Sequence, residues 1–254
     1  MQIYKFRDLT IIDSGKNEKI VIACDSCCGI GEMENDIVRT SNEIVGYFSA
    51  RVCIFELLAF RAYPNVIVNN LGMPMEKYGE NIIKGINKAI KEYNKAGFSR
   101  KINLKECLTG STEDNIKTLQ TFLGLTIIGE KGKEDKKKIE KGENIFLLGI
   151  PKVGEALLED IKGEKSEIIS FKDIKILLKN NIKEILPIGS KGALYEIGQI
   201  ERSNGVDIEL EYEGELLKKS AGPSTALLFV CNEEILKKIK KEIKIPLIKI
   251  GTIR

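Results

Sequence analysis

Hydrophobic residues in this chain occur in two patterns: short continuous runs, and positions spaced three or four residues apart. The runs predict buried strands, and the helical spacings predict amphipathic helices. In the first half, strands are expected over Tyr4 to Ile12, Lys19 to Cys24, Asn65 to Leu71 and near Leu125. Helices are expected there over Ser41 to Phe60, from about Glu80 to Asn94, and from a start near Ser111.

The second half continues this alternation. Its expected strands cover Asn144 to Ile150, Val206 to Tyr212 and Ala226 to Cys231. Its expected helices cover Glu155 to Ile161, about Asp173 to Asn180, Gly192 to Arg202, and Glu233 to Glu242. The stretch Gly129 to Gly142 is almost wholly charged, which is typical of a solvated hairpin or linker. The pattern therefore predicts an α+β protein of two α/β-like lobes, 1–141 and 142–254.

Composition narrows the class of protein. The chain has 254 residues, of which 43% are hydrophobic, so it can bury a real core. Its net charge is only +3 and its Lys and Glu residues are interspersed, so nothing indicates a nucleic-acid surface. No apolar run is long enough to span a bilayer, and Lys5, Arg7 and Asp8 interrupt the first segment, unlike a signal peptide. We therefore expect a cytoplasmic protein that binds neither membrane nor nucleic acid.

The chain contains no histidine, which removes several kinds of catalysis. Ser-His-Asp and Cys-His nucleophilic mechanisms and His-ligated zinc hydrolysis are excluded. Phosphoryl transfer fits the remaining carboxylates, lysines and hydroxyls, because it relies on positioning and charge stabilisation. The Cys-x-x-Cys-Cys spacing of Cys24, Cys27 and Cys28 could indicate zinc, but no second pair follows, so small reduced thiols are the favoured interpretation.

The segment from Ile20 to Gly31 carries the most specific chemical signal. An apolar run ends at Asp25, where the predicted strand would leave the core, and small residues with Gly29 and Gly31 follow. A carboxylate beside backbone N–H groups suits a metal ion together with a phosphate. The alternative is a structural Asp in an ordinary turn. The segment is neither a Walker loop nor a dinucleotide fingerprint, because the required lysine and third glycine are missing.

Five segments, in order, resemble the aminoimidazole ribonucleotide synthetase-like (PurM-like) superfamily. The first two are Ala23 to Ser26, similar to a strand that ends in Thr-Asp, and Val52 to Pro64, similar to a helix with Asn-Asp-Leu followed by Gly-Ala-x-Pro. Thr109 to Thr112 resembles the Gly-Gly-Asp/Glu-Thr turn, and Gly142 to Asn144 resembles the opening of the second half. Ile188 to Val206 resembles Asp-x-Ser/Thr-x-Gly-Gly-Leu with the later Ser-Gly-Val-Gly.

Three positions depart from the family pattern. Phe55 stands in place of Asn, Ser111 in place of a carboxylate, and Gly189 in place of Asp. Glu56 falls on the family's Asp, and a carboxylate on that apolar helix requires either a metal ion or an ion pair, for which Arg51 is the candidate. These differences argue against the purine enzyme itself and leave the number of metal ions open.

The resemblance implies a two-lobed fold, a homodimer in which first-half sheets close into a barrel, and a site for ATP and Mg²⁺. The first lobe would bind ATP and dimerise, and the second would be the PurM-like C-terminal domain. The implied site residues are listed by role: Asp25 and Glu56 for catalysis; Asp25, Ser26, Gly29, Gly31, Gly110, Ser111 and Thr112 for ATP; Gly189, Ser190, Lys191 and Gly192 for substrate; Asp25, Glu56, Glu113 and Asp114 for metal.

Other interpretations of these residues stay open. Glu113 and Asp114 would also be favoured in the first turn of a helix, and an exposed Lys191 often contacts nothing. Gly189 and Gly192 could simply mark the entry to a helix.

Within the superfamily, the segments Cys24 to Glu32 and Ile37 to Val52 are most similar to α-ribazole kinase. That resemblance implies ATP-dependent phosphorylation of the α-ribazole 5′-hydroxyl, a step of cobamide salvage, with a carboxylate as base if a side chain serves. One alternative is an amide- or carbonyl-activating enzyme or thiamine-monophosphate kinase of the same superfamily. Another is a nucleotide-binding protein without turnover, given Ser111 and Gly189.

Overall fold

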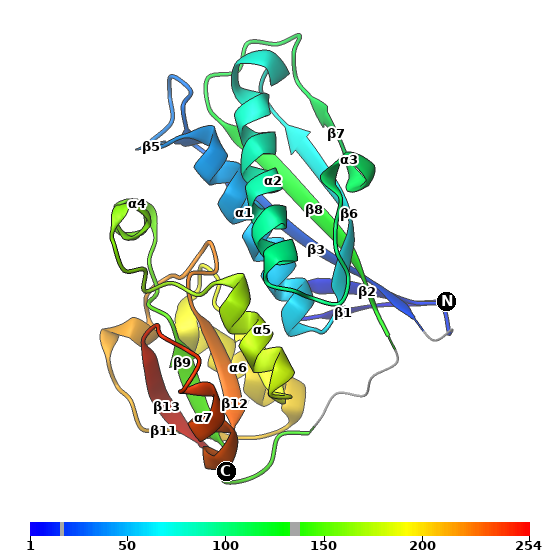
Figure 1. The fold of residues 1–254 in the computed structure, drawn as a ribbon. Helices are drawn as coiled ribbons and strands as arrows, with labels where there is room; N and C mark the ends of the chain where they lie inside the picture. The colour runs from blue at the N-terminus through cyan, green and yellow to red at the C-terminus, as the bar shows by residue number, and fades with distance from the viewer. Residues whose placement is uncertain (16–17, 133–137) are drawn as a thin grey trace. The chain divides into compact units, whose positions relative to one another are not determined.

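Two units make up the chain, Met1–Glu134 and Asp135–Arg254, and each has its own sheet and helices (Figure 1). This computed structural model describes residues 1–15, 18–132 and 138–254. The boundary predicted from the sequence, 141/142, falls inside the second unit and just before its first strand. The centre of the charged stretch, 133–137, lies outside the described residues.

The first unit is built on a six-stranded sheet in the order β1-β2-β3-β8-β6-β7. Neighbouring strands are antiparallel, except that β6 and β7 run parallel. The strands are β1 (Gln2–Phe6), β2 (Leu9–Asp13), β3 (Lys19–Cys28), β6 (Tyr63–Leu71), β7 (Leu108–Thr112) and β8 (Phe122–Lys131). Among the described strands of one chain the sheet does not close, because β1 and β7 are its edges. Closure into a barrel with a second copy stays a prediction.

Two helices, α1 (Asn42–Ala59) and α2 (Glu80–Lys95), cover one face of this sheet and lie side by side (Figure 1). Alternate residues of β3, such as Val21 and Ala23, are fully buried beneath the helices. Cys24, the residue between Ala23 and Asp25, faces the other side of the sheet and is exposed. The two helix backbones touch. A Cβ on Gly46 would lie 2.1 Å from the Ile82 carbonyl oxygen.

Short elements join these strands and helices. They are β4 (Ile30–Gly31), β5 (Val38–Arg39), the π-helical turn η1 (Met75–Gly79) and α3 (Leu104–Cys107). β4 and β5 pair in parallel as a separate small sheet. The predicted strand over Tyr4 to Ile12 is instead the hairpin β1–β2, which turns at Arg7 in the left-handed region, φ 55°.

Two further expectations in this unit are wrong. The helix predicted from Ser111 is absent, because 108–112 extends alongside β6 as strand β7. β3 does not end near Asp25 but continues to Cys28, because every residue from Lys19 to Cys28 pairs with β8. In both cases pairing with a distant strand decides the conformation.

The second unit contains a five-stranded antiparallel sheet in the order β10-β12-β9-β13-β11. Its strands are β9 (Asn144–Leu148), β10 (Glu184–Pro187), β11 (Ile208–Leu210), β12 (Leu227–Cys231) and β13 (Leu247–Ile253). Its helices are α4 (Gly154–Lys162), α5 (Phe171–Lys179), α6 (Gly192–Asn204) and α7 (Glu233–Ile239), with a 3₁₀ turn η2 (Glu215–Leu217). Strand β13 was not predicted from the sequence, and it pairs with β9 with a bulge between Lys249 and Gly251.

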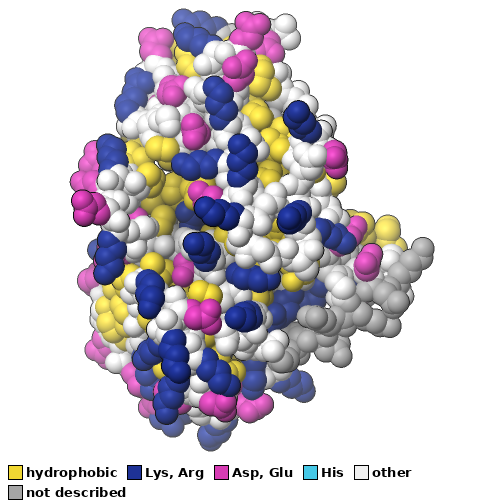
Figure 2. Space-filling view, viewed as in Figure 1, with side chains coloured by type: hydrophobic (Ala, Val, Ile, Leu, Met, Phe, Trp, Pro, Cys, Tyr) yellow, Lys and Arg dark blue, Asp and Glu magenta, His cyan; other side chains and the backbone are white. Residues whose placement is uncertain are grey.

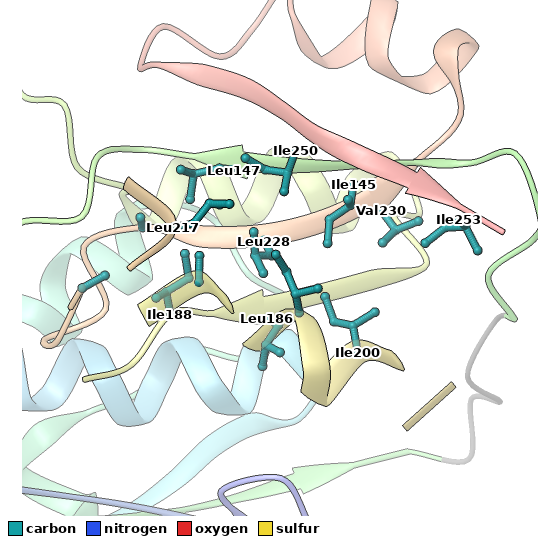
Figure 3. Packing of buried hydrophobic residues seen from close by; sticks show 14 of the residues in the cluster. Ile145, Leu147, Leu186, Ile188, Ile200, Leu217, Leu228, Val230, Ile250 and Ile253 are labelled. Carbon is teal, nitrogen blue, oxygen red and sulfur yellow. The ribbon is translucent and has the colours of Figure 1, made fainter. Parts of the chain in front are cut away.

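The core of the second unit lies between this sheet and α6 (Figure 3). Ile145, Leu147, Leu228 and Val230 from the central strands meet Ile200 of the helix. Every residue of β9 and β12 is buried, so both faces of the sheet are covered. Continuous apolar strands are the sequence signature of such two-sided burial.

On the face seen in Figure 2, Lys and Arg side chains are numerous over the middle, and Asp and Glu side chains are sparser there. Among the described residues, no helix is both long and apolar enough to cross a membrane.

Candidate functional site

Asp25 lies in the middle of β3, on the face that α1 covers. Its carboxylate accepts hydrogen bonds from its neighbour's backbone N–H at Ser26 and from the Ser49 hydroxyl of α1. Burial raises the pKa of this carboxyl to about 6, although both hydrogen bonds act in the opposite direction. A carboxyl with a pKa near neutrality can hold or release a proton in a catalytic cycle. Asp25 is therefore a titratable group under the sheet and does not stand at a strand end.

Glu56 lies on the same helix as Ser49 but seven residues later, about 10 Å along the axis. Cys53 stands between the two carboxylates. Burial, then the charges of Glu56 and Asp25, raise the pKa of its thiol well above the usual value. Arg51, the proposed ion-pair partner of Glu56, is buried with its guanidinium 4.9 Å from the ring centroids of Phe48 and Phe55.

The four predicted metal ligands are not brought together. Asp25 on β3 is hydrogen-bonded to Ser49, and Glu56 lies seven residues further along α1 than Ser49, whereas Glu113 and Asp114 follow the edge strand β7. Within the part of the chain that the structure describes, no group of three or more Asp, Glu or Cys side chains is placed to hold a metal ion. A magnesium ion held by these carboxylates alone does not fit the described part of the chain.

Gly29 and Gly31 belong to a closed loop after β3. The Gly29 N–H donates to the Thr121 carbonyl, and the Gly29 carbonyl accepts from Ile37 N–H. A Cβ on Gly31 would lie 2.4 Å from the Asn42 Oδ1 and Thr121 Oγ1 atoms, so packing requires a glycine there. Ser26 is exposed on the opposite face of β3.

A buried aspartate that the sequence analysis did not assign secures this loop. Asp36 accepts hydrogen bonds from the backbone N–H groups of Met33 and Thr121 and from the Thr121 hydroxyl, at 2.7–2.8 Å. Its oxygens are therefore occupied, and it joins the loop to the start of β8. Gly29 and Gly31, which the resemblance assigns to ATP binding, are thus explained by contacts within the chain itself.

A pocket of about 570 Å³ opens between β7 and the start of α2. Gly110, Ser111 and Thr112, three of the residues predicted to bind ATP, form one wall. η1 and the first turns of α2 form the opposite wall through Met75 and Ile83. This is a concave, partly apolar site of the size that binds small molecules.

Asn69 is the buried polar residue of this pocket, and the sequence analysis missed it. It lies in β6, directly opposite Gly110 in β7, and only 3% of its surface is exposed. Asp25, Leu125, Asn69 and Gly110 form one row across four strands, so Asp25 and Gly110 are about 14 Å apart at normal strand spacing. In the sequence, the feature that could have indicated this residue is the polar pair Asn69-Asn70 within an otherwise apolar strand.

Asp114 joins the two walls of the pocket. One carboxylate oxygen accepts from the Met75 backbone N–H at 3.0 Å, and the other accepts from the Thr112 hydroxyl at 2.8 Å. These two hydrogen bonds, the Thr112 one first, lower the pKa of Asp114. Glu113 accepts from the backbone N–H groups of Asn115 and Ile116 and so closes a turn. Both carboxylates therefore support the loop after β7.

In the second unit, the predicted substrate residues form the connection from β10 to α6. The Gly189 carbonyl accepts from the backbone N–H groups of Gly192 and Ala221, which fixes this connection against the segment before β12. Gly192 has φ 79°, and a Cβ there would lie 2.9 Å from the Lys218 carbonyl oxygen. Ser190 and Lys191 are exposed, and the Lys191 ammonium lies 4.3 Å from the Tyr195 ring centroid.

Comparison with solved structures defines the fold as PurM-like α+β, as the motif resemblance implied. AaThiL complexed with AMPPCP and TMP has a TM-score of 0.64 at 15% identity, over 97% of this chain and 84% of that one. Thiamine-monophosphate kinase from Stenotrophomonas maltophilia has a TM-score of 0.60 at 16% identity, over 97% and 86%. T. maritima PurL complexed with ATP has a TM-score of 0.54 at 13% identity, over 97% and 37%. No protein-family model and no curated protein matches the chain.

Proposed function

We propose that this protein is an ATP-dependent enzyme that transfers a phosphoryl group to a small molecule. The observation that carries the proposal is the fold, which extends over 97% of the chain and is shared with AaThiL complexed with AMPPCP and TMP. The pocket beside Gly110 to Thr112 supports it. The segment Thr109 to Thr112 resembles the family's Gly-Gly-Asp/Glu-Thr turn, although Ser111 replaces the carboxylate. The absence of histidine is compatible with phosphoryl transfer, which needs positioning more than nucleophilic side chains.

The phosphoryl acceptor has two candidates, and they depend on different observations. Thiamine monophosphate is favoured by the similarity to thiamine-monophosphate kinase over nearly the whole chain. α-Ribazole depends only on the resemblance of the segments Cys24 to Glu32 and Ile37 to Val52, and nothing in the comparisons selects it. The comparisons therefore support the thiamine-monophosphate type better.

In either reaction an acceptor oxygen forms a bond to the γ-phosphorus of ATP while the bond from that phosphorus to the β,γ-bridging oxygen breaks. ADP leaves with the bridging oxygen. An acceptor hydroxyl must also lose its proton, and a side-chain base, if one is used, is a carboxylate because the chain lacks histidine. Asp25, whose pKa burial raises to about 6, is our candidate for that base.

A direct test incubates the purified chain with ATP, magnesium and single acceptors, and detects products by mass spectrometry. We expect ADP together with a phosphorylated acceptor from thiamine monophosphate or α-ribazole, and no reaction with selenide or adenosine. Phosphate released with a dehydrated product would instead favour the amide- or carbonyl-activating alternative. Tight ATP binding without ADP formation on any acceptor would favour a binding protein and contradict the proposal.

A matched pair of glycine variants connects the activity to the pocket. A Cβ at position 110 would lie 1.9 Å from the Asn69 carbonyl oxygen, so Gly110→Ala should distort the wall and lower turnover at least tenfold. Gly124→Ala, in strand β8 of the same sheet, would have its nearest neighbour at 3.9 Å and should retain activity. Equal activity of the two variants would place the reaction elsewhere.

A further inference from the structure

We propose that the solvent-facing side of α2 is a docking surface for an acidic α-helix of another protein. Four exposed lysines of this helix form a basic stripe on it: Lys84, Lys88, Lys91 and Lys95. At about 3.6 residues per turn and about 1.5 Å per residue, they lie within about 60° around the helix axis and along about 16 Å of its length. Lys and Arg side chains are visible in Figure 2 over the region that α2 occupies in Figure 1.

The lysines of the basic stripe form no ion pair with any residue that the structure describes. The Lys84 ammonium donates to the Asn81 Oδ1 atom at 3.0 Å, and the Lys88 ammonium lies 5.1 Å from the Tyr47 ring centroid. Glu92, a carboxylate on the same helix, accepts from the Tyr47 hydroxyl at 2.6 Å instead. The positive charge of the stripe is therefore left to solvent or to a partner.

Stability of the helix does not explain the basic stripe. Like charges three or four residues apart on a helix repel one another and destabilise it. Only Lys95, in the last turn, is favoured by the helix dipole. On α7, by contrast, Lys238 pairs with Glu234 at 2.8 Å. Carboxylates supplied by a partner would turn the repulsion along α2 into attraction.

The spacing of the basic stripe matches a second α-helix. Intervals of four, three and four residues are the heptad spacing at which two helices packed side by side present facing positions to each other. A nucleic acid fits less well, because the exposed side of α2 has no aromatic residue on which a base could stack. A lipid surface fits less well too, because the apolar face of α2 packs on α1 and cannot enter a bilayer.

A second copy of this chain does not supply such a helix. Among the described helices, none has acidic residues at this spacing, and α4, with Glu155 and Glu159 exposed, has the longest match. The partner is therefore a different protein with Asp or Glu in a row along one helix face. Charged surfaces of this kind act mainly on the rate of association and the choice of partner, so we expect a weak complex that salt dissociates.

Binding of two synthetic peptides to the full chain, measured by fluorescence anisotropy at low salt, tests the stripe. Both peptides are alanine-rich and helical and have the same composition. One has glutamates at the spacing of the stripe, and the other has them distributed around the helix. The matched peptide should bind at least tenfold more tightly than the other, and added salt should weaken its binding.

Two double variants connect the binding to α2. Lys88→Glu with Lys91→Glu should lower the affinity for the matched peptide at least tenfold, whereas Lys84 is kept because it also lines the pocket beside β7. Lys237→Glu with Lys241→Glu changes the net charge equally at exposed positions in and after α7, and its affinity should stay within twofold of the wild type. Both variants should form ADP at the rate of the wild type, which separates docking from the proposed activity.

Three results would overturn the proposal. One is equal affinity of the wild type for the two peptides, which decides the matter even if the α2 variant fails to fold. The second is unchanged affinity for the matched peptide in the folded α2 variant. The third is tighter binding of a single-stranded RNA of equal charge, or of phosphatidylserine vesicles, than of the matched peptide, which would assign the stripe to another class of partner.

Discussion

At the scale of single residues, Asp25 is a carboxyl in a place that disfavours its charge. It lies between the sheet and α1, and its hydrogen bonds from Ser26 and Ser49 do not offset the loss of hydration. Selection for stability alone would favour an uncharged residue at this position. Carboxyls with raised pKa values are common where a protein needs a proton acceptor, which is the role that the proposed reaction gives Asp25.

The pH dependence of unfolding follows from this position. The Asp25 pKa is about 6 in the folded chain against 3.8 for the unfolded one, so the folded state holds the proton more tightly. Its contribution to stability is therefore lost as pH rises from about 4 to about 6, on the order of 3 kcal/mol in total. Asp25→Asn cannot titrate, so its stability relative to the wild type should increase across that interval while phosphoryl transfer falls.

Urea unfolding at several pH values between 4 and 8 measures the difference. Asp207→Asn is the control, because Asp207 is exposed and its side chain makes no hydrogen bond among those of the described residues. A constant difference between Asp25→Asn and the wild type over this range would contradict the assigned pKa.

At the scale of elements, the covering layer of the first unit depends on two glycines. Gly46 in α1 and Gly85 in α2 lie where the helices meet, and a Cβ on Gly85 would be 2.0 Å from the Glu43 carbonyl oxygen. Such close approach of two helix backbones is possible only without side chains at the contact. Because Asp25 packs under α1 and the pocket is bounded by α2, this contact also positions both parts of the candidate site.

Gly85→Ala should therefore destabilise the protein although alanine favours helices. Overpacking against a rigid backbone costs about 1–3 kcal/mol. Replacement of glycine by alanine in a helix gains only about 1 kcal/mol, so the cost at least equals the gain. Gly198→Ala in α6 is the matched control. Its Cβ would meet only the flexible end of Arg202, at 3.3 Å, so a small gain in stability is expected. Chemical denaturation of both variants measures the change in the free energy of unfolding. An equal change in Gly85→Ala and Gly198→Ala would contradict the close contact between the two helices.

At the scale of the whole molecule, the face of the first sheet opposite α1 and α2 carries aliphatic side chains. Ile22, Ile128 and Val66 form one row across β3, β8 and β6, and Val66 is 37% exposed. Ile20 and Ile3, also exposed, extend the apolar surface toward β1. We propose that a second copy of the chain covers this face, which is the homodimer implied by the family resemblance.

Light scattering at micromolar concentration should therefore give twice the 28.4 kDa mass of one chain. Val66→Lys places a charge in the middle of the apolar row and should produce monomers. Ile161→Lys is the control, because Ile161 is an equally exposed aliphatic residue on α4 of the second unit and should leave the dimer intact. A monomeric wild type would rule out the interface.

The sequence by itself determined the elements whose pattern is local. The apolar spacing of α1 and α2 predicted both helices to within two residues, and the apolar runs predicted β3, β6 and β9, because solvent sorts side chains by the period of each element. Five short motifs in order also predicted the PurM-like fold, which the solved structures confirm.

The tertiary structure alone decided what depends on pairing between distant segments. β7 is a strand because 108–112 pairs with β6, and β13 forms because β9 accepts it about 100 residues away. The register of β3 against β8 turned Asp25 toward α1, and the register of β6 against β7 placed Asn69 over Gly110. A shift of one residue would reverse each facing, and no local pattern encodes it, so the arrangement of the site follows from long-range packing.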